Sequence, residues 1–529
     1  MLWRSRLSRF FGISSLVLMA SVAQAQGPKV TIDSGVIQGA VNNGVAAFKG
    51  IPYAQPPLRE LRWRAPQPVK PWTGVRDATK YGSDCLQNQS NLGFTNSIPP
   101  LSEDCLYINV LEPADRPATG KLPVMVWIYG GGSVIGGTTP PVYQGYEFAK
   151  HDVIFVSMNY RLGRMGYFAH PALTSENADG MIGNYGYMDQ IAALKWVQRN
   201  IAAFGGDPSN VTVFGESHGG RSVQMLLGTS LAKGLFQRVI IESGFGRMYQ
   251  RPLSVAIGGG LPSAEEVGLE FAKSLGITGT DDSALEQLRA MPADKIIGSV
   301  AFSSGRENYT GPMIDGKLVP ADSADIYLSG DGQRVPILIG TNDEDTGTAP
   351  GKTADDILNS FGPYRDEAQA AYHANSSSDV AKLAVLVGRD RNEIEPARFI
   401  ARVYTSMGMP VYEYRFSYVA SSRRDAWTGA HHASEIPFVF DTIGTRPGTV
   451  TSADDEKVAH LMIQYWTNFA KSGDPNGEGL PSWPRYSPQS DELLNFTTDA
   501  QAVAMPDPFK ARLDVVVAAA SAVAAVTLR

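Results

Sequence analysis

The chain has 529 residues, of which 43% are hydrophobic and 19% charged, and its formal net charge is −7. This balance is that of a globular protein and excludes a disordered or fibrous chain, and the acidic net charge gives no electrostatic basis for binding nucleic acid. Two cysteines are too few for a disulfide-rich scaffold, a cysteine-rich zinc module or an iron–sulfur cluster.

The N-terminal segment has the features of a bacterial secretory signal. Arg4, Arg6 and Arg9 give it a basic start, an apolar stretch covers residues 10–22, and Ala23-Gln24-Ala25 is a small-x-small cleavage pattern. The apolar stretch is shorter than the roughly 20 residues that span a bilayer. We therefore expect a signal peptide over residues 1–25 that is cleaved after Ala25. The mature chain then loses three arginines and no acid, carries a charge of −10, has no membrane span, and is secreted or periplasmic.

Short apolar runs rich in Val and Ile predict strands that are covered on both faces. They cover residues 124–129, 153–159, 211–214, 239–242, 335–340 and 411–418. Helical periodicity lies between several of these runs, at residues 188–201, 263–275 and 283–289. Strands that alternate with helices predict an α/β fold with a large, mostly parallel central sheet and helices on both faces. We expect one domain over residues 26–529, with a polar helical excursion from about residue 349 to 397.

The strand expected at residues 211–214 runs directly into Gly215-Glu216-Ser217-His218-Gly219. This G-x-S-x-G pattern is typical of a nucleophile elbow, in which a tight strand-to-helix turn exposes the serine hydroxyl. A second glycine run, residues 130–132, follows the strand expected at 124–129. Successive backbone N–H groups in such a loop stabilise an oxyanion together with the amide after the nucleophile. The sequence thus predicts Ser217 as the nucleophile and Gly131, Gly132 and His218 as oxyanion-hole donors.

A serine nucleophile needs a base and an acid, and elbow enzymes carry them in the order Ser, acid, His. His431 and His432 lie far downstream of Ser217. Three adjacent acids, Asp343, Glu344 and Asp345, follow the strand expected at residues 335–340. The pattern alone does not choose among them.

The chain resembles the type-B carboxylesterases, the carboxylesterase/cholinesterase family of α/β-hydrolases, from about residue 36 to residue 486. Four segments carry the resemblance, at residues 47–57, 103–110, 183–198 and 469–476. The resemblance implies an α/β-hydrolase fold with loop and helical excursions over the active site. It also implies a serine carboxylic-ester hydrolase that works through an acyl-enzyme, with a small-molecule ester as substrate and no metal or organic cofactor.

The resemblance also implies roles for individual residues. The family's acid is the Glu of an Asp-Glu-Gly triplet, which falls on Glu344, and its base falls on His432, with His431 as the alternative. Its first disulfide falls on Cys85 and Cys105, and Ser243 matches a second serine near the triad. The chain departs from the family at His218, where Ala is usual, and at Asp345 and Ala433, where Gly is usual.

Substrate preference is less constrained by the sequence. The segment between Cys85 and Cys105 lacks the Trp that binds choline by cation–π contact in cholinesterases, and its one aromatic residue is Phe94, so we expect a non-choline ester of a xenobiotic, aromatic or polycarboxylic acid. Four arginines near glycine-rich loops either line the pocket and favour carboxylate-bearing esters or pair with acids; they are Arg161, Arg164, Arg221 and Arg247. The alternatives are a catalytically silent binding module and an amidase or thioesterase on the same triad.

Overall fold

The structure is a computed structural model. It describes residues 27–88, 96–116, 120–177, 180–247, 250–255, 262–301, 304, 308–445 and 450–527, with side chains up to residue 521. The expected signal peptide and Phe94 lie outside the described residues. None of the helices within the described ranges combines the length and apolar character that crossing a membrane requires.

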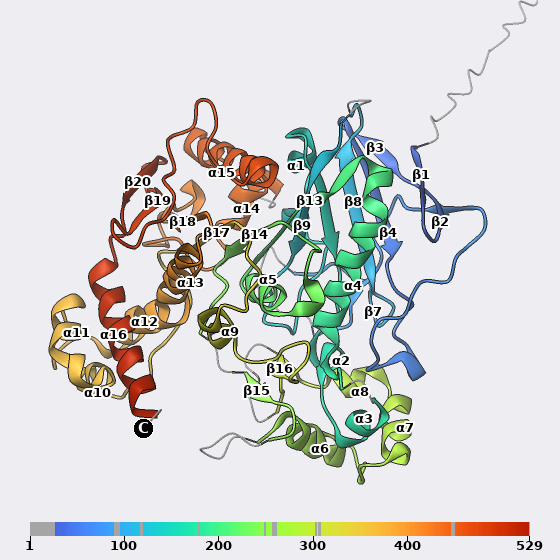
Figure 1. The fold of residues 1–529 in the computed structure, drawn as a ribbon, viewed down its shortest axis with the longest axis horizontal. Helices are drawn as coiled ribbons and strands as arrows, with labels where there is room; N and C mark the ends of the chain where they lie inside the picture. Colours follow the sequence, from blue (N-terminus) through green and yellow to red (C-terminus); the bar gives the residue numbers. More distant parts are fainter. Residues whose placement is uncertain are drawn as a thin grey trace, which may run out of the picture.

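One eleven-stranded sheet runs through the molecule (Figure 1). From one edge to the other its strands are β20 (Ala502–Pro506), β19 (Glu492–Phe496), β18 (Val411–Phe416), β17 (Ile337–Asn342), β14 (Arg238–Glu242), β13 (Gly206–Glu216), β9 (Leu122–Ile128), β10 (Ile154–Met158), β8 (Tyr107–Pro113), β4 (Val45–Pro52) and β3 (Ala40–Asn42). Pairing is parallel from β19 to β10 and antiparallel at both edges. The parallel strands are almost entirely buried, as the Val- and Ile-rich runs predicted.

Helices cover both faces of this sheet (Figure 1). The helices are α1 (Tyr146–Lys150), α2 (Gly163–Gly166), α3 (Pro171–Glu176), α4 (Tyr185–Asn200), α5 (His218–Gly228), α6 (Ala264–Ser274), α7 (Asp282–Ala290), α8 (Ala293–Ile297), α9 (Ser323–Ser329), α10 (Ala354–Asn359), α11 (Arg365–Ala371), α12 (Val380–Arg389), α13 (Glu395–Ser406), α14 (Ile436–Val439), α15 (Ala453–Ser472) and α16 (Lys510–Thr527). On one face α5 and α13 pack against the central strands, and on the other α1 and α15 do. The core lies between these layers and the sheet.

Four small sheets flank the main one. They are β1 (Lys29–Ile32) with β2 (Gly35–Gln38) and β5 (Val75–Asp77), β6 (Asp84–Cys85) with β7 (Leu101–Ser102), β11 (Tyr167–Phe168) with β12 (Gly183–Asn184), and β15 (Arg251–Pro252) with β16 (Met313–Ile314). The expected disulfide joins Cys85, the last residue of β6, to Cys105. A bridge that closes a loop of this length stabilises the fold by about 3 kcal/mol in the chain-entropy view.

The expected helices have clear local causes. Ser263 caps the N-terminus of α6 through a reciprocal pair of hydrogen bonds with Glu266. This capping box explains why the helix begins in the acid-rich first part of residues 263–275. The polar stretch predicted as an excursion forms α10 to α12, which make a small apolar core of their own with α16. This group lies beside the main sheet, at the left of Figure 1.

Candidate active site

The candidate site lies at the carboxyl ends of neighbouring parallel strands. The loops after β9, β13, β14 and β17 carry Gly131, Ser217, Ser243 and Asp345, and the chain after β18 returns with His432. In parallel sheets these ends share one edge, where loops from successive strands meet. The sheet order therefore brings together residues that are far apart in the sequence.

Ser217 occupies a strained turn between β13 and α5. Its backbone has φ 57° and ψ −122°, a region that non-glycine residues rarely adopt, and its N–H donates to the carbonyl of Glu242 at 2.9 Å. Glycine is required next to it, because a Cβ on Gly219 would lie 2.0 Å from the carbonyl oxygen of Ile128. Ser217 is the residue directly before α5 and ends the turn from β13, as the elbow motif predicted, and it is 7% exposed.

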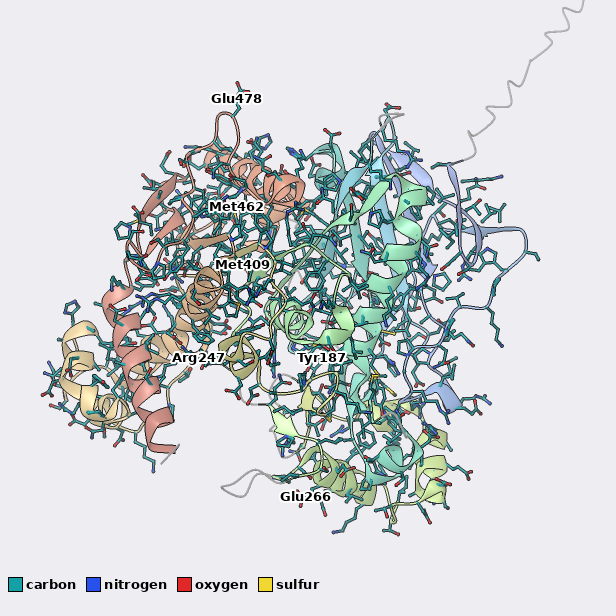
Figure 2. The ribbon with its side chains drawn as sticks, in the orientation of Figure 1. Tyr187, Arg247, Glu266, Met409, Met462 and Glu478 are labelled. Atoms are coloured by element: carbon teal, nitrogen blue, oxygen red, sulfur yellow. A yellow bond between two sulfur atoms is a disulfide. The ribbon has the colours of Figure 1, made fainter. Side chains whose placement is uncertain are left out.

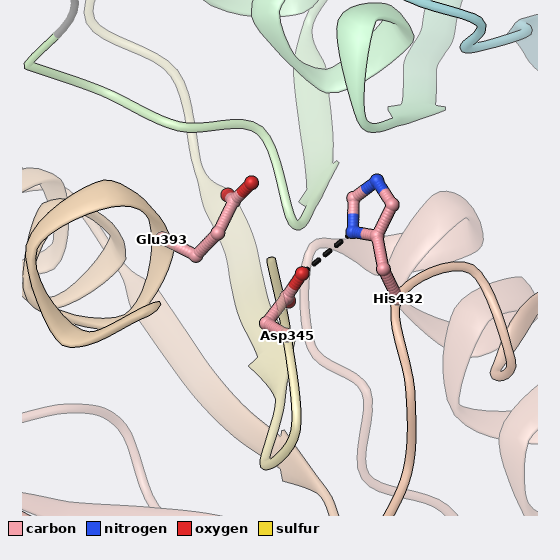
Figure 3. A group of neighbouring side chains, drawn as sticks. All are labelled: Asp345, Glu393 and His432. Atoms are coloured by element: carbon pink, nitrogen blue, oxygen red, sulfur yellow. Dashed lines mark hydrogen bonds and ion pairs between the residues drawn. The ribbon is translucent and has the colours of Figure 1, made fainter. Parts of the chain in front are cut away.

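His432 lies between Ser217 and Asp345. Its Nε2 is 2.9 Å from Ser217 Oγ. Its Nδ1 is 2.5 Å from Asp345 Oδ1, the contact marked by the dashed line in Figure 3. The hydrogen bond to Asp345 fixes the orientation of the imidazole. A serine, an imidazole and a carboxylate are thus joined by two consecutive hydrogen bonds, the order that nucleophilic serine enzymes use.

The acid that contacts His432 is Asp345, and the assignment of Glu344 to this position is wrong. Beyond β17, Glu344 pairs with His431 in an isolated parallel bridge, so its side chain projects on the same side as that of His431. Glu344 there accepts from Thr428 Oγ1 at 2.8 Å and lies 3.2 Å from His431 Nε2. Because successive side chains of an extended segment project to opposite sides, Asp345 falls on the side of His432.

Asp345 is fully buried and held by several donors. Its carboxylate accepts from Ser243 Oγ at 2.6 Å, from the N–H of Thr346 at 2.9 Å and from the N–H of Asn342 at 3.1 Å. Burial opposes ionisation, but His432 and these hydrogen bonds outweigh it and hold the pKa of Asp345 below its usual value. The structure thus places Ser243 in contact with the acid next to the imidazole.

The loop after β9 presses its glycines against Ser217. A Cβ on Gly130 would lie 2.8 Å from the Glu216 carbonyl oxygen and 3.0 Å from the Ser217 Cβ, and Gly131 adopts φ 104°. Among the described residues, the N–H groups of Gly131, Gly132 and His218 donate to no protein acceptor. Tyr309 steadies this loop, since its hydroxyl lies 3.1 Å from Ser133 Oγ. Three adjacent amides without a protein acceptor suit an oxyanion.

The His218 imidazole is packed between aromatic rings. It stacks on Tyr187 of α4, which is labelled in Figure 2, with ring centroids 6.0 Å apart, and meets Tyr167 edge-on at 6.1 Å. No hydrogen bond joins it to Glu216 or Glu344 within the described chain. Burial, with Arg221 nearby, lowers the pKa of His218 well below its usual value, so this imidazole is neutral.

Three buried glutamates, Glu216, Glu242 and Glu435, lie near Ser217, His432 and Asp345. Glu216 Oε1 lies 3.2 Å from His432 Nε2, Trp466 Nε1 donates to Glu242 at 2.7 Å, and Asn342 Nδ2 donates to Glu435 at 2.5 Å. Burial raises the pKa of all three glutamates, that of Glu242 to about 8, and the charge of His432 opposes the rise at Glu216. Burial alone would lower the pKa of His432, but Glu216 and Asp345 outweigh it and bring this pKa well above its usual value.

Asp345, Glu393 and His432 form the one His/Cys/Asp/Glu group in the described ranges whose possible metal-ligand atoms all lie within 4.8 Å of one another (Figure 3). The geometry favours a hydrogen-bonded pair rather than a metal centre. Two ligands about 2.1 Å from a common ion lie roughly 3.0–3.4 Å apart. The 2.5 Å between Asp345 Oδ1 and His432 Nδ1 is shorter than this separation.

The arginines singled out from the sequence are occupied in different ways. Arg161 forms a buried ion pair with Asp189 at 2.8 Å, and Arg247, labelled in Figure 2, pairs with Glu395 at 2.7 Å. Arg164 donates to the carbonyls of residues 296, 297 and 308. Arg161 and Arg247 are thus neutralised by acids, and the ion pair of Arg161 is buried rather than on the surface.

Sequence reasoning left several residues of this site without a role. Asp345 was one of three open candidates, and an Asp-Glu-Gly triplet matched one residue later, onto 344–346, would have pointed to it. For Glu216, the only indication in the sequence of a contact with His432 is its position directly before Ser217. Glu393 and Glu435 carry no local motif, since burial against the triad depends on packing between distant elements.

Comparisons with known proteins identify the family of the chain. A model of the "Carboxylesterase family" matches residues 26–360 and 363–512. The chain is 34% identical over 528 residues to a fumonisin B1 esterase of Sphingopyxis macrogoltabida, covering 93% of each chain. It is 34% identical over 497 residues to a para-nitrobenzyl esterase of Bacillus subtilis, covering 88% of this chain and 94% of the relative.

A solved structure of a PNB esterase superposes with a TM-score of 0.78 at 32% identity, covering 92% of this chain and 99% of that one. The α/β-hydrolase fold expected from the sequence is confirmed by this superposition and by the mixed sheet with helices on both faces. With a family model that spans nearly the whole described chain and relatives named as esterases, the chain belongs to the carboxylesterase family.

Proposed function

We propose that the protein is a serine carboxylic-ester hydrolase whose triad is Ser217, His432 and Asp345. The observation that carries the proposal is the unbroken hydrogen-bonded sequence from Ser217 Oγ through His432 to Asp345, with distances of 2.9 Å and 2.5 Å. Membership of the carboxylesterase family supports ester hydrolysis as the reaction.

In the proposed first half-reaction His432 Nε2 takes the proton of Ser217 Oγ as this oxygen attacks the ester carbonyl carbon. The carbonyl oxygen becomes an oxyanion held by the N–H groups of Gly131, Gly132 and His218. Asp345 holds Nδ1–H and stabilises the imidazolium. The imidazolium then gives its proton to the departing alkoxide, which leaves as an alcohol, and the acyl group remains on Ser217 as an ester.

In the second half-reaction water attacks the acyl carbon while His432 takes its proton. The tetrahedral intermediate collapses, Ser217 leaves with the proton from His432, and the carboxylic acid is released. No metal or redox cofactor enters either half-reaction. The side chain of His218 is neutral, and only its backbone N–H acts in this mechanism, as a donor to the oxyanion.

A phosphonate label tests the assignment of the nucleophile. A fluorophosphonate probe is expected to modify the protein with a stoichiometry of one and to be found on the peptide that contains Ser217, because only an activated serine attacks phosphorus at a useful rate. Mass spectrometry of the digest gives the site. A protein that hydrolyses p-nitrophenyl acetate but carries the label on another residue would contradict the triad.

For the substrate we infer a small-molecule ester without a choline group. The test series compares an ester, a thioester and an amide that share the same acyl group. It also includes p-nitrobenzyl esters and fumonisin B1, because one relative is named for fumonisin B1 and another for para-nitrobenzyl esters. The largest kcat/KM is expected for an ester. Faster turnover of the thioester or amide would favour an alternative reaction on the same triad, and an inert protein would favour a binding module.

The environment of His432 predicts how activity depends on pH. The base must be neutral to accept a proton, so kcat/KM rises with pH through the pKa of His432, which lies above its usual value. Replacing Glu216 by Gln removes the carboxylate 3.2 Å from Nε2. A nearby negative charge favours the imidazolium, so its loss lowers the pKa of His432 and moves the acid limb of kcat/KM to lower pH.

The pH series is measured with p-nitrophenyl acetate on wild type and Glu216→Gln. Glu112→Gln is a matched control, because Glu112 is a buried acid on β8 that pairs with Arg116 and not with the triad. The control is expected to keep the wild-type acid limb. A limb in Glu216→Gln that stays in place or moves to higher pH would show that this carboxylate does not set the basicity of His432.

We also infer that the chain is exported after cleavage at Ala25 and that residues 26–529 act as a single domain. The basic start, apolar stretch and Ala-Gln-Ala site support export, and the family match beginning at residue 26 supports the boundary. N-terminal sequencing of the protein from periplasm and medium of an expressing bacterium is expected to begin at Gln26. Full-length protein retained in the cytoplasm would contradict export.

A further inference from the structure

A further carboxylate reaches the Asp345–His432 pair from outside the strand ends. Glu393 lies in the π-helical turn Asp390–Ile394 between α12 and α13, and its side chain is fully buried. Figure 3 shows its carboxyl group directed toward the space beside Asp345 and His432, and the facing atoms of the three side chains lie within 4.8 Å of one another. π-helical turns inserted between α-helices frequently occur at functional sites.

Glu393 is bonded to both loops that hold the acid of the triad. Its Oε1 accepts from Thr346 Oγ1 at 3.2 Å, and Thr346 directly follows Asp345. Its Oε2 accepts from the N–H of Phe245 at 2.9 Å, and Phe245 lies two residues after Ser243, which itself donates to Asp345. The side chain therefore connects the ends of β14 and β17 at the point where they face His432.

The two carboxyl groups beside His432 have unequal support. Asp345 accepts from Ser243, Thr346 and Asn342 and contacts the imidazole directly, whereas Glu393 accepts from two donors. Burial raises the pKa of Glu393 well above its usual value; the charge of Asp345 adds to this rise and His432 opposes it. Two close carboxyl groups whose pKa values are pushed apart take different protonation states. Asp345 therefore carries the charge, and Glu393 carries a proton.

We propose that Glu393 is a reserve acid, a positioning residue that braces Asp345 and His432 in the native enzyme and supplies the carboxylate beside His432 when Asp345 is neutralised. This role rests on the proposed triad and goes beyond it. In Asp345→Asn the like charge is gone, so the pKa of Glu393 falls and its carboxyl releases its proton to solvent at a lower pH than in the native enzyme. Burial still favours the protonated form, so the carboxylate of Glu393 forms as the pH rises. The resulting carboxylate then stabilises the imidazolium across the same few ångströms.

A double-mutant cycle separates this role from a purely structural one. Residues of one catalytic unit normally lose little more activity once the first of them is removed, and independent residues give additive losses. If Glu393 is a reserve acid, its replacement costs more activity, not less, once Asp345 has been replaced. Glu393→Gln in the native background is expected to lower kcat/KM less than about tenfold. The same change in the Asp345→Asn background is expected to cost at least about tenfold more than it does in the native one.

The substitution Glu393→Gln keeps the size of the side chain, and Glu393→Asp provides a second variant if the first folds poorly. Glu395→Gln is a matched control, because Glu395 is a buried acid two residues further on that pairs with Arg247 instead of facing His432. Its effect is expected to be the same in both backgrounds. Active sites are counted by fluorophosphonate labelling of Ser217, so that each kcat refers to folded enzyme.

A pH profile gives a readout that a structural brace would not move. The residual kcat of Asp345→Asn is expected to rise with pH as Glu393 ionises, and the rise is expected to disappear in Asp345→Asn/Glu393→Gln. Additive or sub-additive losses in the cycle, or a rise that survives the second substitution, would overturn the reserve acid while leaving the triad intact. A wild-type protein without Ser217-dependent hydrolysis would overturn both proposals.

Discussion

Replacing Ser217 by alanine is expected to lower kcat/KM for p-nitrophenyl acetate by about 10⁴- to 10⁶-fold. The substitution removes the oxygen that we propose forms the acyl-enzyme, the atom that lies 2.9 Å from His432 Nε2. The residual rate comes from the oxyanion-hole donors and from binding of the ester near them. Initial rates at equal concentrations of active protein, followed over several hours for the variant, measure the loss.

Ser230→Ala is the matched control for this experiment, because Ser230 is an exposed serine at the opposite end of α5 from Ser217 and is not a hydrogen-bond partner of Ser217, His432 or Asp345. It is expected to keep wild-type kinetics and thermal stability. A Ser217→Ala protein that folds normally and keeps more than about one-hundredth of the wild-type kcat/KM would contradict the nucleophile, since triad serines contribute far more than that.

The parts of the site that the sequence predicted are those set by local geometry. The elbow around Ser217 needs glycine because a side chain on Gly219 would collide with the carbonyl of Ile128, and that requirement is visible in the sequence itself. The apolar runs that form β9, β13 and β17 likewise predicted where the loops that carry the site residues begin. Since parallel strands have their carboxyl ends at one edge, the convergence of these loops followed from the strand pattern.

The choice among the three acids could not be predicted in the same way. It depends on the register between the segment after β17 and the segment that contains His431, which are 87 residues apart at the bond between Asp345 and His432. The bridge between Glu344 and His431 fixes this register and turns Asp345 inward. A strand pattern ends at Asn342 and says nothing of side-chain directions beyond it.

Glu393 was beyond the reach of sequence patterns for a related reason. Its π-helical turn interrupts the helical periodicity between α12 and α13, and the partner that buries it is a loop more than a hundred residues upstream, at Phe245. The packing of His218 had a partial signal, since a bulky aromatic ring at a position that usually holds Ala must find space. The residues that provide this space, Tyr167 and Tyr187, are known only from the fold.

The second large effect is expected at Asp345 and not at Glu344. Asp345→Asn removes the charge that stabilises the imidazolium, and the amide that replaces the carboxylate can present its NH₂ to Nδ1 and favour the wrong tautomer of His432. In a serine protease triad such a change costs about 10⁴-fold in kcat. Here we expect kcat/KM to fall by about 10²- to 10³-fold, because the proposed reserve acid Glu393 supplies a carboxylate in place of Asp345.

Glu344→Gln is the decisive comparison, because it changes the neighbouring acid by the same single substitution of oxygen by nitrogen. Glu344 is bonded to Thr428 and His431 at the outer side of the site, so its loss leaves the contact between Asp345 and His432 in place. We expect kcat/KM to stay within about threefold of wild type, as for other substitutions that touch no reacting group. Steady-state kinetics on both variants, with the rate of fluorophosphonate labelling of Ser217 as an independent measure of nucleophile activation, decides between the acids. The reverse ranking, with Glu344→Gln the more damaging change in both assays, would mean that the loop after β17 adopts the other register in the working enzyme.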